Sequence, residues 1–534
     1  MNRAHLKVGG TYKKVISFPV FLGFLLVAAG FAGRRLNLEE VCRSSAGSIP
    51  EFFFQGDTWV HIKIGSDILR LGAWPTSDSY SFTAEGRPWV AYEWLGGVAL
   101  ALAARLGGLP ALMALLVVLA ATILVLLYYY AYLRSGSSIA AFVACVLLLP
   151  LASLSFAIRP QLFGYIFLLL TLICVELFNQ GRQKFIWLLP GLFAIWVNTH
   201  ATVFWGLFAL ILPYLGSSRT FRSGGIEAYR WSAGVRRRLV IVLLLCVAAL
   251  TVSPYGIRLI LHIVRLGISQ PIVMSNFAEW LAIDFSQMPG KLLLGFLLLF
   301  MLDLIVFRPT YRLEEIALLF VAIYVACVHG RFILLFVPVF APVLATRLSR
   351  FIPPYESSKD RYLLNALLVV LISAGIVRFF PSKALLHAAM ARAFPLGAMA
   401  YVQHNPVGPM WNDPGWGGYM VWALPTHKVF IDGRLDFYEQ AGVLPDFVHV
   451  ARLEPDTLSI LRKYGVRSCL TERGSQLSTL LGVRPEWQLA YTDELSSVYT
   501  YQRTDPQKGP KKKSSRSMDD SWRWREHSGF AEPR

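Results

Sequence analysis

Charged residues are scarce in this sequence: Asp, Glu, Lys and Arg make up 16% of its 534 residues, where a soluble domain has about a quarter. Acidic residues are the scarcer kind, 33 against 51 basic ones, so the net charge is +18. Hydrophobic residues make up 55%, and the mean hydropathy is +0.50. This composition argues against a soluble protein and predicts a polytopic membrane protein surrounded by the lipid bilayer.

The excess of positive charge does not indicate a nucleic-acid partner. The Lys and Arg residues lie in short loops between apolar runs and in the C-terminal tail, where membrane topology accounts for them. Cysteine is rare as well, and none of the six residues forms a CxxC pair or a Cys/His cluster typical of zinc. Four of the six lie inside apolar runs, where small core side chains are expected: Cys145, Cys174, Cys246 and Cys327.

Eleven apolar runs are expected to cross the bilayer. The first, from Val15 to Gly33, nearly reaches the ~20 residues that a spanning helix needs. Its basic start also fits a cleaved signal peptide, but we interpret it as an uncleaved span. The other ten lie at about 109–133, 138–157, 160–178, 185–199, 201–216, 239–254, 291–307, 314–329, 331–346 and 363–380. The run "WLGGVALALAARLGG" is too short to cross and predicts a helix along the membrane surface.

The loop charges orient these spans. If the N-terminus is cytoplasmic, alternate loops carry the basic residues, as the positive-inside rule requires. These residues are Arg134, Arg182, Lys184, Arg219, Arg222, Arg230, Arg236, Arg237, Arg238, Arg308, Arg312, Arg347, Arg350, Lys359 and Arg361. We expect most of them to lack acidic partners. The odd number of spans places the C-terminal part outside the cytoplasm.

Three parts of the chain follow from this topology. Residues 1–380 form an all-α membrane domain, with residues 34–108 as a long first outer loop. Residues 381–505 lose the long apolar runs, and "HKVFIDGR", "VRSCLTE", "EWQLAYTD" and "SSVYTYQR" predict strands around a helix at "PDTLSILRKYG". We therefore expect a small α/β domain on the outer face, followed by a basic, disordered tail at 506–534.

Polar residues gather at the outer ends of the spans. The candidates for a functional site are Asp57, His61, Arg159, Gln161, Asn198, His200, Glu279, His329 and Arg331. Ionisable groups at membrane depth are costly and are functional candidates by default. Because these lie on one side, we expect them to line an outward-facing polar cavity under the first loop and the C-terminal domain.

The set fits group transfer from a phosphate-bearing lipid. A carboxylate takes a proton from an incoming hydroxyl group, and guanidinium groups hold the leaving phosphate. Three tryptophans of the first loop suit both the membrane interface and stacking on sugar rings: Trp59, Trp89 and Trp94.

Each candidate also has a plain structural explanation. Asp57 fits the N-cap of the helix predicted for "TWVHIKIGSDILRL", and His61 fits a surface position. Arg159 fits an interfacial position that reaches a lipid headgroup, and Arg331 fits a lipid-phosphate contact with no catalytic purpose. The polar residues of "WVNTHA" fit the satisfaction of backbone groups at a helix end.

Several motifs together resemble the GT-C membrane glycosyltransferases that use polyprenyl-phosphate sugars. They are "GDTWVHIKIG", "EGRPWVAYEWLGG" and "RPQLFGYIFLLLTLICVE". More narrowly, "WVNTHA", "CVHGRFILLFVPV" and "NDPGWGGYMVWALPTHKVFIDGRLDFY" are similar to bacterial mannosyltransferase-like or RgtA/B/C/D-like membrane proteins. The resemblance covers about residues 10 to 500.

This resemblance implies a GT-C-like membrane domain in a bacterial inner membrane and a catalytic Asp just after the first span. By position, Asp57 is then the general base of an inverting transfer. The donor is a polyprenyl-phosphate-linked sugar, and the acceptor is an extracytoplasmic glycan, lipid or protein. We take Arg159 and Arg331 as the ligands of the lipid phosphate from their depth alone.

The chain departs from the resemblance in its acidic motifs. The first loop has one Asp where some relatives have an acidic pair, and the "WWDYG" element of oligosaccharyltransferases is missing. We therefore predict no metal and no other cofactor.

The C-terminal part adds two candidates, Asp432 and Arg434, in "VFIDGRLDFY". They flank a glycine at the end of a predicted strand, a usual place for a binding loop, and a structural Asp–Arg pair that closes a turn fits equally. In "WGGYMVWALP", Gly417 and Gly418 indicate a close approach of two backbones. The functional interpretation is that this domain covers the cavity and helps to choose the acceptor.

Two other functions fit the chain in part. A transporter or flippase for a lipid-linked saccharide favours charges buried mid-span and repeated broken helices, and few such features occur here. A non-catalytic membrane scaffold would bind a partner through its outer domain. For the scaffold, the side chain of Asp57 should cap a helix beside lipid and not face a cavity.

Overall fold

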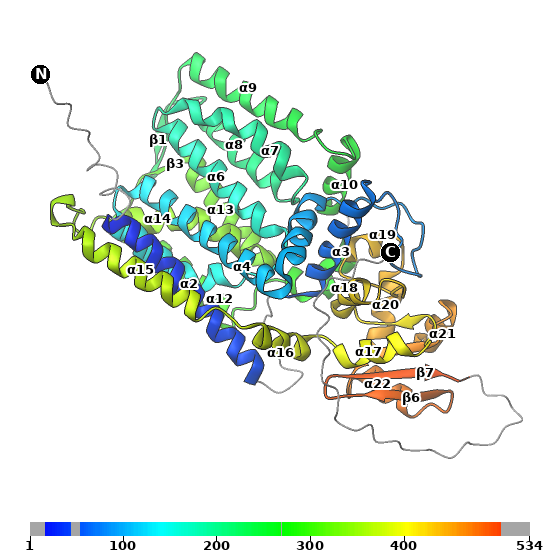
Figure 1. Cartoon of the computed structure of the whole chain (residues 1–534). Coiled ribbons are helices and arrows are strands. Elements are labelled where there is room, and N and C mark those ends of the chain that lie inside the picture. Colours follow the sequence, from blue (N-terminus) through cyan, green and yellow to red (C-terminus); the bar gives the residue numbers. More distant parts are fainter. Residues whose placement is uncertain (1–16, 44–53, 269, 503–534) are drawn as a thin grey trace, which may run out of the picture.

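The computed structural model describes residues 17–43, 54–268 and 270–502 (Figure 1). Four of the helices in these residues are long and apolar enough to cross a membrane: Trp94–Ser135, Gln161–Asn179, Met288–Phe307 and Gly330–Leu348. A bent pair, Tyr362–Arg378 with Lys383–Ala393, makes a fifth if it is one span. Helices of this length and composition indicate a membrane-embedded protein, whereas the total of eleven spans stays a prediction.

A helix lies on each of the eleven predicted ranges. In chain order these are α2 (Phe18–Arg43), α4 (Trp94–Ser135), α5 (Ser138–Ser153), α6 (Gln161–Asn179), α7 (Leu189–Val197), α8 (Val203–Gly216), α9 (Ala233–Ala249), α12 (Met288–Phe307), α13 (Leu313–Val328), α14 (Ile333–Leu348) and α15 (Tyr362–Arg378). Short 3-10 helices, η1 (Gln183–Leu188) and η3 (Gly330–Phe332), lead into α7 and α14.

These helices form one bundle around α14. That helix is buried along most of its length and packs against α4, α5 and α13, as expected for a helix that is apolar all round. Helices α2 and α15 lie side by side along one edge, and α9 lies at the opposite edge beside α7 (Figure 1).

Two helix boundaries differ from the prediction. Helix α2 continues to Arg43, ten residues past the expected start of the first loop. The short apolar run at 94–108 does form a helix, but it is joined to the following span in α4 across a break at Gly107 and Gly108. The break has φ 60° and ψ −140° at Gly108, a combination that residues with a side chain rarely adopt.

The expectation that most basic residues of the predicted cytoplasmic loops lack acidic partners is wrong for three arginines. Arg134 pairs with Glu176 and Glu315, at 3.1 and 2.6 Å, so it ties the ends of α4, α6 and α13 together. Two further pairs act in the same way: Arg312 with Glu176, and Arg347 with Asp303. Charges near the bilayer are costly, and these acids from neighbouring helices compensate them.

The remaining elements lie around one end of the bundle. They are α3 (Gly56–Leu71), α10 (Ile257–Ile268), α11 (Pro271–Asn276), η2 (Ala278–Trp280), α16 (Lys383–Ala393), α17 (Leu396–His404), α18 (Pro414–Ala423), α19 (Leu435–Gln440), α20 (Leu444–Ala451), α21 (Thr457–Lys463) and α22 (Gln476–Gly482). Elsewhere, η4 (Ser357–Lys359) precedes α15, and a small sheet joins β1 (Phe221–Ser223), β2 (Ile226–Ala228) and β3 (Tyr311–Arg312).

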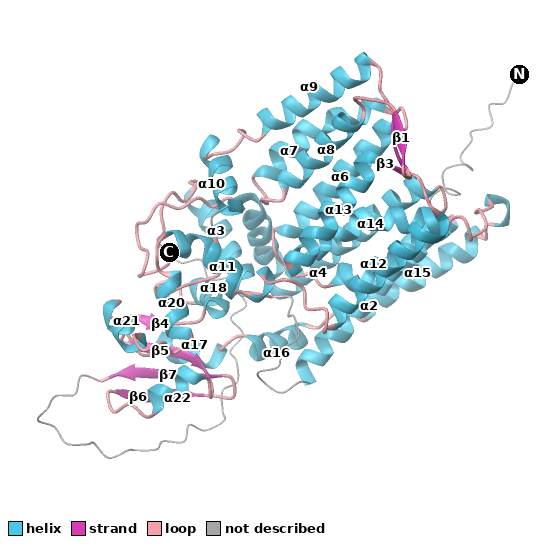
Figure 2. Cartoon of the chain, turned by 180° about the vertical axis from the view of Figure 1, so that it is seen from behind, coloured by secondary structure: helices cyan, strands magenta, loops and turns pink. Residues whose placement is uncertain are grey.

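A four-stranded sheet forms the outer end of the C-terminal part (Figure 2). Its order is β4-β5-β7-β6, from β4 (Met410–Trp411), β5 (Ser468–Glu472), β7 (Ser496–Tyr501) and β6 (Trp487–Thr492). Strands β4 and β5 are parallel and the other pairs are antiparallel. The predicted strands at "VRSCLTE", "EWQLAYTD" and "SSVYTYQR" and the helix at "PDTLSILRKYG" are confirmed.

The predicted strand at "HKVFIDGR" is wrong. Only Val429 forms isolated bridges there, to Ser81 and Met410. Its backbone groups pair with the first loop instead: the Val429 N–H donates to Tyr80 O, and the Phe82 N–H donates to Val429 O. This segment is thus bound to the first loop, and its single bridge to Met410 of β4 adds no strand to the sheet.

Helix α18 packs directly on α3 of the first loop. An added Cβ at Gly418 would lie 2.0 Å from Gly56 O, and one at Gly417 would lie 2.0 Å from Ile431 O. The predicted close backbone approach is confirmed at both glycines. Trp59 is 2% exposed and packs in this contact against Tyr419 and Trp422, so it stacks on no substrate sugar.

Candidate active site

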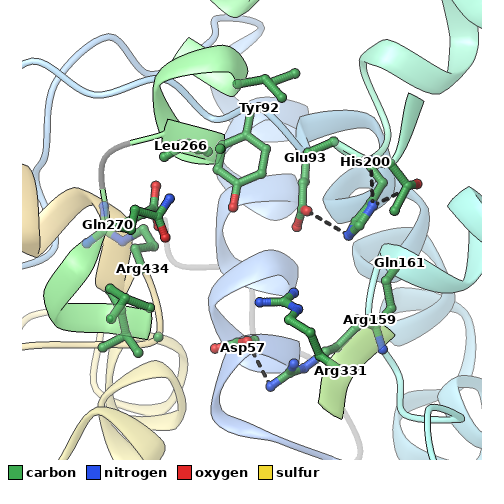
Figure 3. A pocket seen from close by; sticks show the side chains of 18 of the residues that line it. Asp57, Tyr92, Glu93, Arg159, Gln161, His200, Leu266, Gln270, Arg331 and Arg434 are labelled. Carbon is green, nitrogen blue, oxygen red and sulfur yellow. Dashed lines mark hydrogen bonds and ion pairs between the residues drawn. The ribbon is translucent and has the colours of Figure 1, made fainter. Parts of the chain in front are cut away.

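A cavity of about 570 Å³ lies where the first loop, the helix ends and the C-terminal part meet (Figure 3). Nine predicted residues line it: Asp57, His61, Arg159, Gln161, His200, Glu279, His329, Arg331 and Arg434. The other two candidates, Asn198 and Asp432, lie behind its wall.

Asp57 lies in the first turn of α3 and faces the cavity. The N-cap of this helix is Gln55, whose backbone N–H donates to Thr58 Oγ1 at 3.1 Å. Asp57 is therefore not the N-cap, although the helix dipole favours a carboxylate in this turn. Its Oδ2 atom lies 2.9 Å from Nη2 of Arg159.

Arg159 bridges two carboxylates. Its Nη1 atom lies 2.9 Å from Oε2 of Glu279, in addition to the contact with Asp57. Its side chain is only 13% exposed, and Nε has no partner in the described residues. A buried guanidinium with two acids does not reach a lipid headgroup, and its charge is already compensated.

The two carboxylates that share Arg159 differ in their ionisation. Burial raises the pKa of Asp57, and Arg159 opposes this while Glu279 adds to it. Arg159 lowers the pKa of Glu279 to about 2 against the effect of burial. Glu279 thus remains ionised, whereas the raised pKa of Asp57 makes this carboxylate a stronger proton acceptor, as a general base requires.

Glu93, which the sequence analysis did not select, binds two imidazoles in this cavity. It lies directly before α4, and its oxygens lie 3.1 Å from Nε2 of His61 and 3.2 Å from Nε2 of His200. Nδ1 of His200 accepts from the backbone N–H of Thr202 at 3.1 Å, so Nε2 carries the hydrogen that is donated to Glu93. Burial opposes the charge of Glu93, but the two histidines and Arg331 outweigh it and lower its pKa.

Burial also lowers the pKa of His200 to about 4, although Glu93 acts against this shift. At neutral pH, His200 is therefore uncharged and stabilises Glu93 through the hydrogen bond that it donates. The result is a fixed anion on the wall next to His61, one turn along α3 from Asp57.

Arg331 has no hydrogen-bond or ion-pair partner within the described part of the chain. Its guanidinium stacks on the ring of Trp280, 4.3 Å from the centroid. His329 donates from Nδ1 to the backbone carbonyl of Trp280 at 2.6 Å, and its ring packs edge-on against the indole. Gln161 donates to Ser155 O at 3.3 Å. Arg331 therefore differs from Arg159 in having its donors available to a ligand.

Arg434 and Asp432 form a buried structural pair. Asp432 is fully buried and accepts from Nε and Nη2 of Arg434 at 2.8 and 2.6 Å. Arg434 also reaches Asp78 of the first loop at 2.7 Å and lies over the ring of Trp89. The pair thus binds the C-terminal part to the first loop.

The glycine between Asp432 and Arg434 touches the candidate base. A Cβ added to Gly433 would lie 1.8 Å from Oδ1 of Asp57. Only a residue without a side chain fits here, so the "FIDGR" segment closes over Asp57.

Asn198 joins the walls of the cavity from behind. Its amide donates to Ala194 O and Val252 O, at 2.8 and 2.7 Å, and its Oδ1 accepts from the indole of Trp94 at 2.8 Å. Trp94 and Trp89 both line the cavity. Further lining residues that the sequence analysis missed are Tyr92, Gln270 and Asp436.

Within residues 17–43, 54–268 and 270–502, no three His, Cys, Asp or Glu side chains are grouped closely enough to hold a metal ion. The expectation that the reaction needs no metal stays a prediction.

No family model and no curated protein matches the sequence. Among solved structures, the chain is similar to the oligosaccharyltransferase of Archaeoglobus fulgidus in the apo form, with 10% identity, a TM-score of 0.49, and 84% of this chain and 69% of that chain covered. It is also similar to AglB from the same organism in complex with an inhibitory peptide and a dolichol-phosphate, with 11% identity, a TM-score of 0.46 and the same coverage.

A third similar structure is ArnT from Cupriavidus metallidurans bound to undecaprenyl phosphate. Its identity is 12% and its TM-score 0.45, with 89% of this chain and 97% of that chain covered. These neighbours are of the kind that the sequence motifs resemble. Since all three TM-scores are below 0.5, the function of this chain has to be argued from its own cavity.

Proposed function

We propose that this protein is a membrane glycosyltransferase that moves a sugar from a polyprenyl-phosphate donor to an acceptor outside the cytoplasm. The observation that carries the proposal is the placement of Asp57 and Arg331 in one cavity. Asp57 is a carboxylate with a raised pKa, and Arg331 is a cation without an acidic partner among the described residues. A proton acceptor and a phosphate ligand are the two groups that such a transfer needs.

The reaction is a single displacement at the anomeric carbon. Asp57 takes the proton of the acceptor hydroxyl as its oxygen forms the new bond to that carbon. The bond between the carbon and the phosphate oxygen breaks, and polyprenyl phosphate leaves with the electron pair. Because the acceptor attacks from the side opposite the phosphate, the configuration at this carbon inverts.

Arg331 stabilises the charge that develops on the leaving phosphate. Its flat guanidinium is held on the indole of Trp280, so little side-chain freedom is lost when a phosphate binds. Arg159 has a different task. It holds Asp57 in position. Because Glu279 compensates part of the charge of Arg159, Asp57 keeps a pKa high enough to accept a proton.

The alternation of basic loops supports the further proposal that this cavity lies on the outer face of a bacterial inner membrane, with the N-terminus in the cytoplasm. That Asp57 faces a cavity, and does not cap a helix, favours catalysis over a scaffold role.

The test compares wild type with Asp57→Asn in purified protein, using a panel of undecaprenyl-phosphate hexoses and release of undecaprenyl phosphate as the readout. We expect roughly a 10²- to 10⁴-fold loss of kcat when the base is removed. Asp67→Asn is the matched control, because Asp67 lies on the same helix but binds Lys63 and Arg70 away from the cavity. Equal turnover by wild type and Asp57→Asn would refute the proposal.

A further inference from the structure

One end of the cavity is polar, and the described residues that line it include no free cation. It is formed by Tyr92 of the first loop, Gln270 before α11, and Asp436 of α19. In Figure 3, Gln270 and Arg434 lie on one side of the cavity, Glu93 and His200 lie on the other, and Tyr92 projects between them. Nothing in the proposed transfer uses the three residues of this polar end.

The side chains at the polar end have unused hydrogen-bonding capacity. Gln270 is only 4% exposed, yet its amide has no partner among the described residues. The hydroxyl of Tyr92 has none either, and it also lines the cavity. Both side chains line the cavity, so their polar groups are free to hydrogen-bond a ligand there.

The charge at the polar end is negative. Arg434 also lines it, but Asp432 and Asp78 compensate its charge at 2.6 and 2.7 Å. Among the described residues, the ion-pair partner of Asp436 is His262, at 3.8 Å, and burial lowers the pKa of that histidine to about 4. Burial likewise raises the pKa of Asp436 to about 6, so at pH 7 it is mostly ionised beside a neutral imidazole.

We infer that the polar end of the cavity binds the hydroxyl groups of an uncharged saccharide, the acceptor of the transfer. An amide, a phenol and a carboxylate offer donors and acceptors together, as vicinal hydroxyl groups require. The uncompensated carboxylate repels phosphates and uronic acids. The donor phosphate goes to Arg331, which leaves the polar end to the second substrate.

The assignment to the acceptor rests on the proposed function, whereas the ligand class does not. Binding is therefore measured without turnover, in the full-length protein in lipid nanodiscs, by saturation-transfer NMR. The probes are methyl β-glucopyranoside and methyl β-glucuronide, which differ by a carboxylate. We expect the glucoside to bind at least roughly tenfold more tightly than the glucuronide, because the charge of Asp436 opposes the second probe.

Substitutions then assign the site. Gln270→Leu and Tyr92→Phe should each weaken glucoside binding by roughly five- to tenfold, the loss of one hydrogen bond. Gln440→Leu is the matched control, since Gln440 is exposed at the end of α19. Asp436→Asn should bring the glucuronide to within about threefold of the glucoside, because the repulsion is gone.

Several results would overturn the inference. They are equal binding of the two probes to wild type, no binding of either, or unchanged binding by Gln270→Leu with a melting temperature like that of wild type. Asp57→Asn separates the two proposals. This variant should bind the glucoside as wild type does, because Asp57 is not one of the residues of the polar end. If it also kept full turnover, the proposed transferase function would be refuted, whereas the saccharide site would still stand.

Discussion

Substitution of Arg159 by Gln should move the pH dependence of the reaction toward alkaline pH. Asp57 would lose the cation at 2.9 Å and keep Glu279 as a negative neighbour. At a charge separation of ~4 Å and an effective dielectric constant of ~20, the lost attraction is about 4 kcal/mol, or about 3 pKa units. The side chain of Asp57 is 27% exposed to the cavity, so we expect a rise in its pKa of about 2 to 3 units.

The assay is a profile of kcat/KM against pH. A base is active when ionised, so activity rises with pH through the pKa of Asp57, and this acid limb should shift upward by the same about 2 to 3 units in Arg159→Gln. Arg159→Lys keeps the charge and should leave the limb within about one unit of wild type. A limb that stays in place in Arg159→Gln, or moves to acid pH, would show that Arg159 does not control the ionisation of the base.

Three further outcomes test other contacts of the cavity. Gly433→Ala should lower kcat by roughly 10²-fold at an unchanged melting temperature, because the added Cβ would lie 1.8 Å from Oδ1 of Asp57 and force that carboxylate to move. The control is Gly482→Ala, where the atom nearest to the added Cβ is 3.5 Å away, and it should have no effect. Arg331→Gln should raise the KM for the lipid donor by roughly tenfold or more, with Arg331→Lys in between; a donor KM like that of wild type would exclude a phosphate contact. Glu93→Gln should lower the free energy of unfolding at pH 7 by about 1.5 to 3 kcal/mol, because one imidazole N–H then faces an amide N–H. The pKa of Glu93 is lowered on folding, so the stabilisation by its carboxylate is fully present above the ordinary pKa of 4.5. This stabilisation is lost as the pH falls through the lowered pKa. Thermal unfolding should therefore show that the difference in stability between wild type and Glu93→Gln shrinks at such low pH.

The helices of the bundle could be predicted because the bilayer permits little else. An apolar run in lipid has to satisfy its own backbone hydrogen bonds, so its composition alone predicts a helix. The boundaries were less accurate where packing decides them, as at Gly107 and Gly108, which break α4 after its surface segment. In the C-terminal part, alternation predicted β5, β6 and β7, but "HKVFIDGR" has the same pattern and binds the first loop instead. Periodicity indicates an extended chain and does not name its partner.

The position of Asp57 could be predicted from its place after the first span, and its immediate contacts could not. Glu93 lies in the same loop, but it acts through His61 and His200, which are 32 and 107 residues away along the chain. Gln270 shows the same limit. Nothing local distinguishes this glutamine, and only the fold places its amide in the cavity wall without a partner among the described residues.

Arg159 and Arg331 show most clearly what sequence alone leaves open. Both follow an apolar run at the same predicted side of the membrane, and both were predicted to hold the lipid phosphate. In the structure, Glu279 supplies Arg159 with a second carboxylate, while Arg331 contacts the rings of Trp280 and Phe332 and no acid of the described residues. A guanidinium that already has two acids gains little from a phosphate and has to give up a contact to bind one, whereas an uncompensated one gains the full charge-assisted hydrogen bonds. The acids that surround an arginine therefore decide whether it positions the base or binds the substrate, and these acids come from loops far away in the chain.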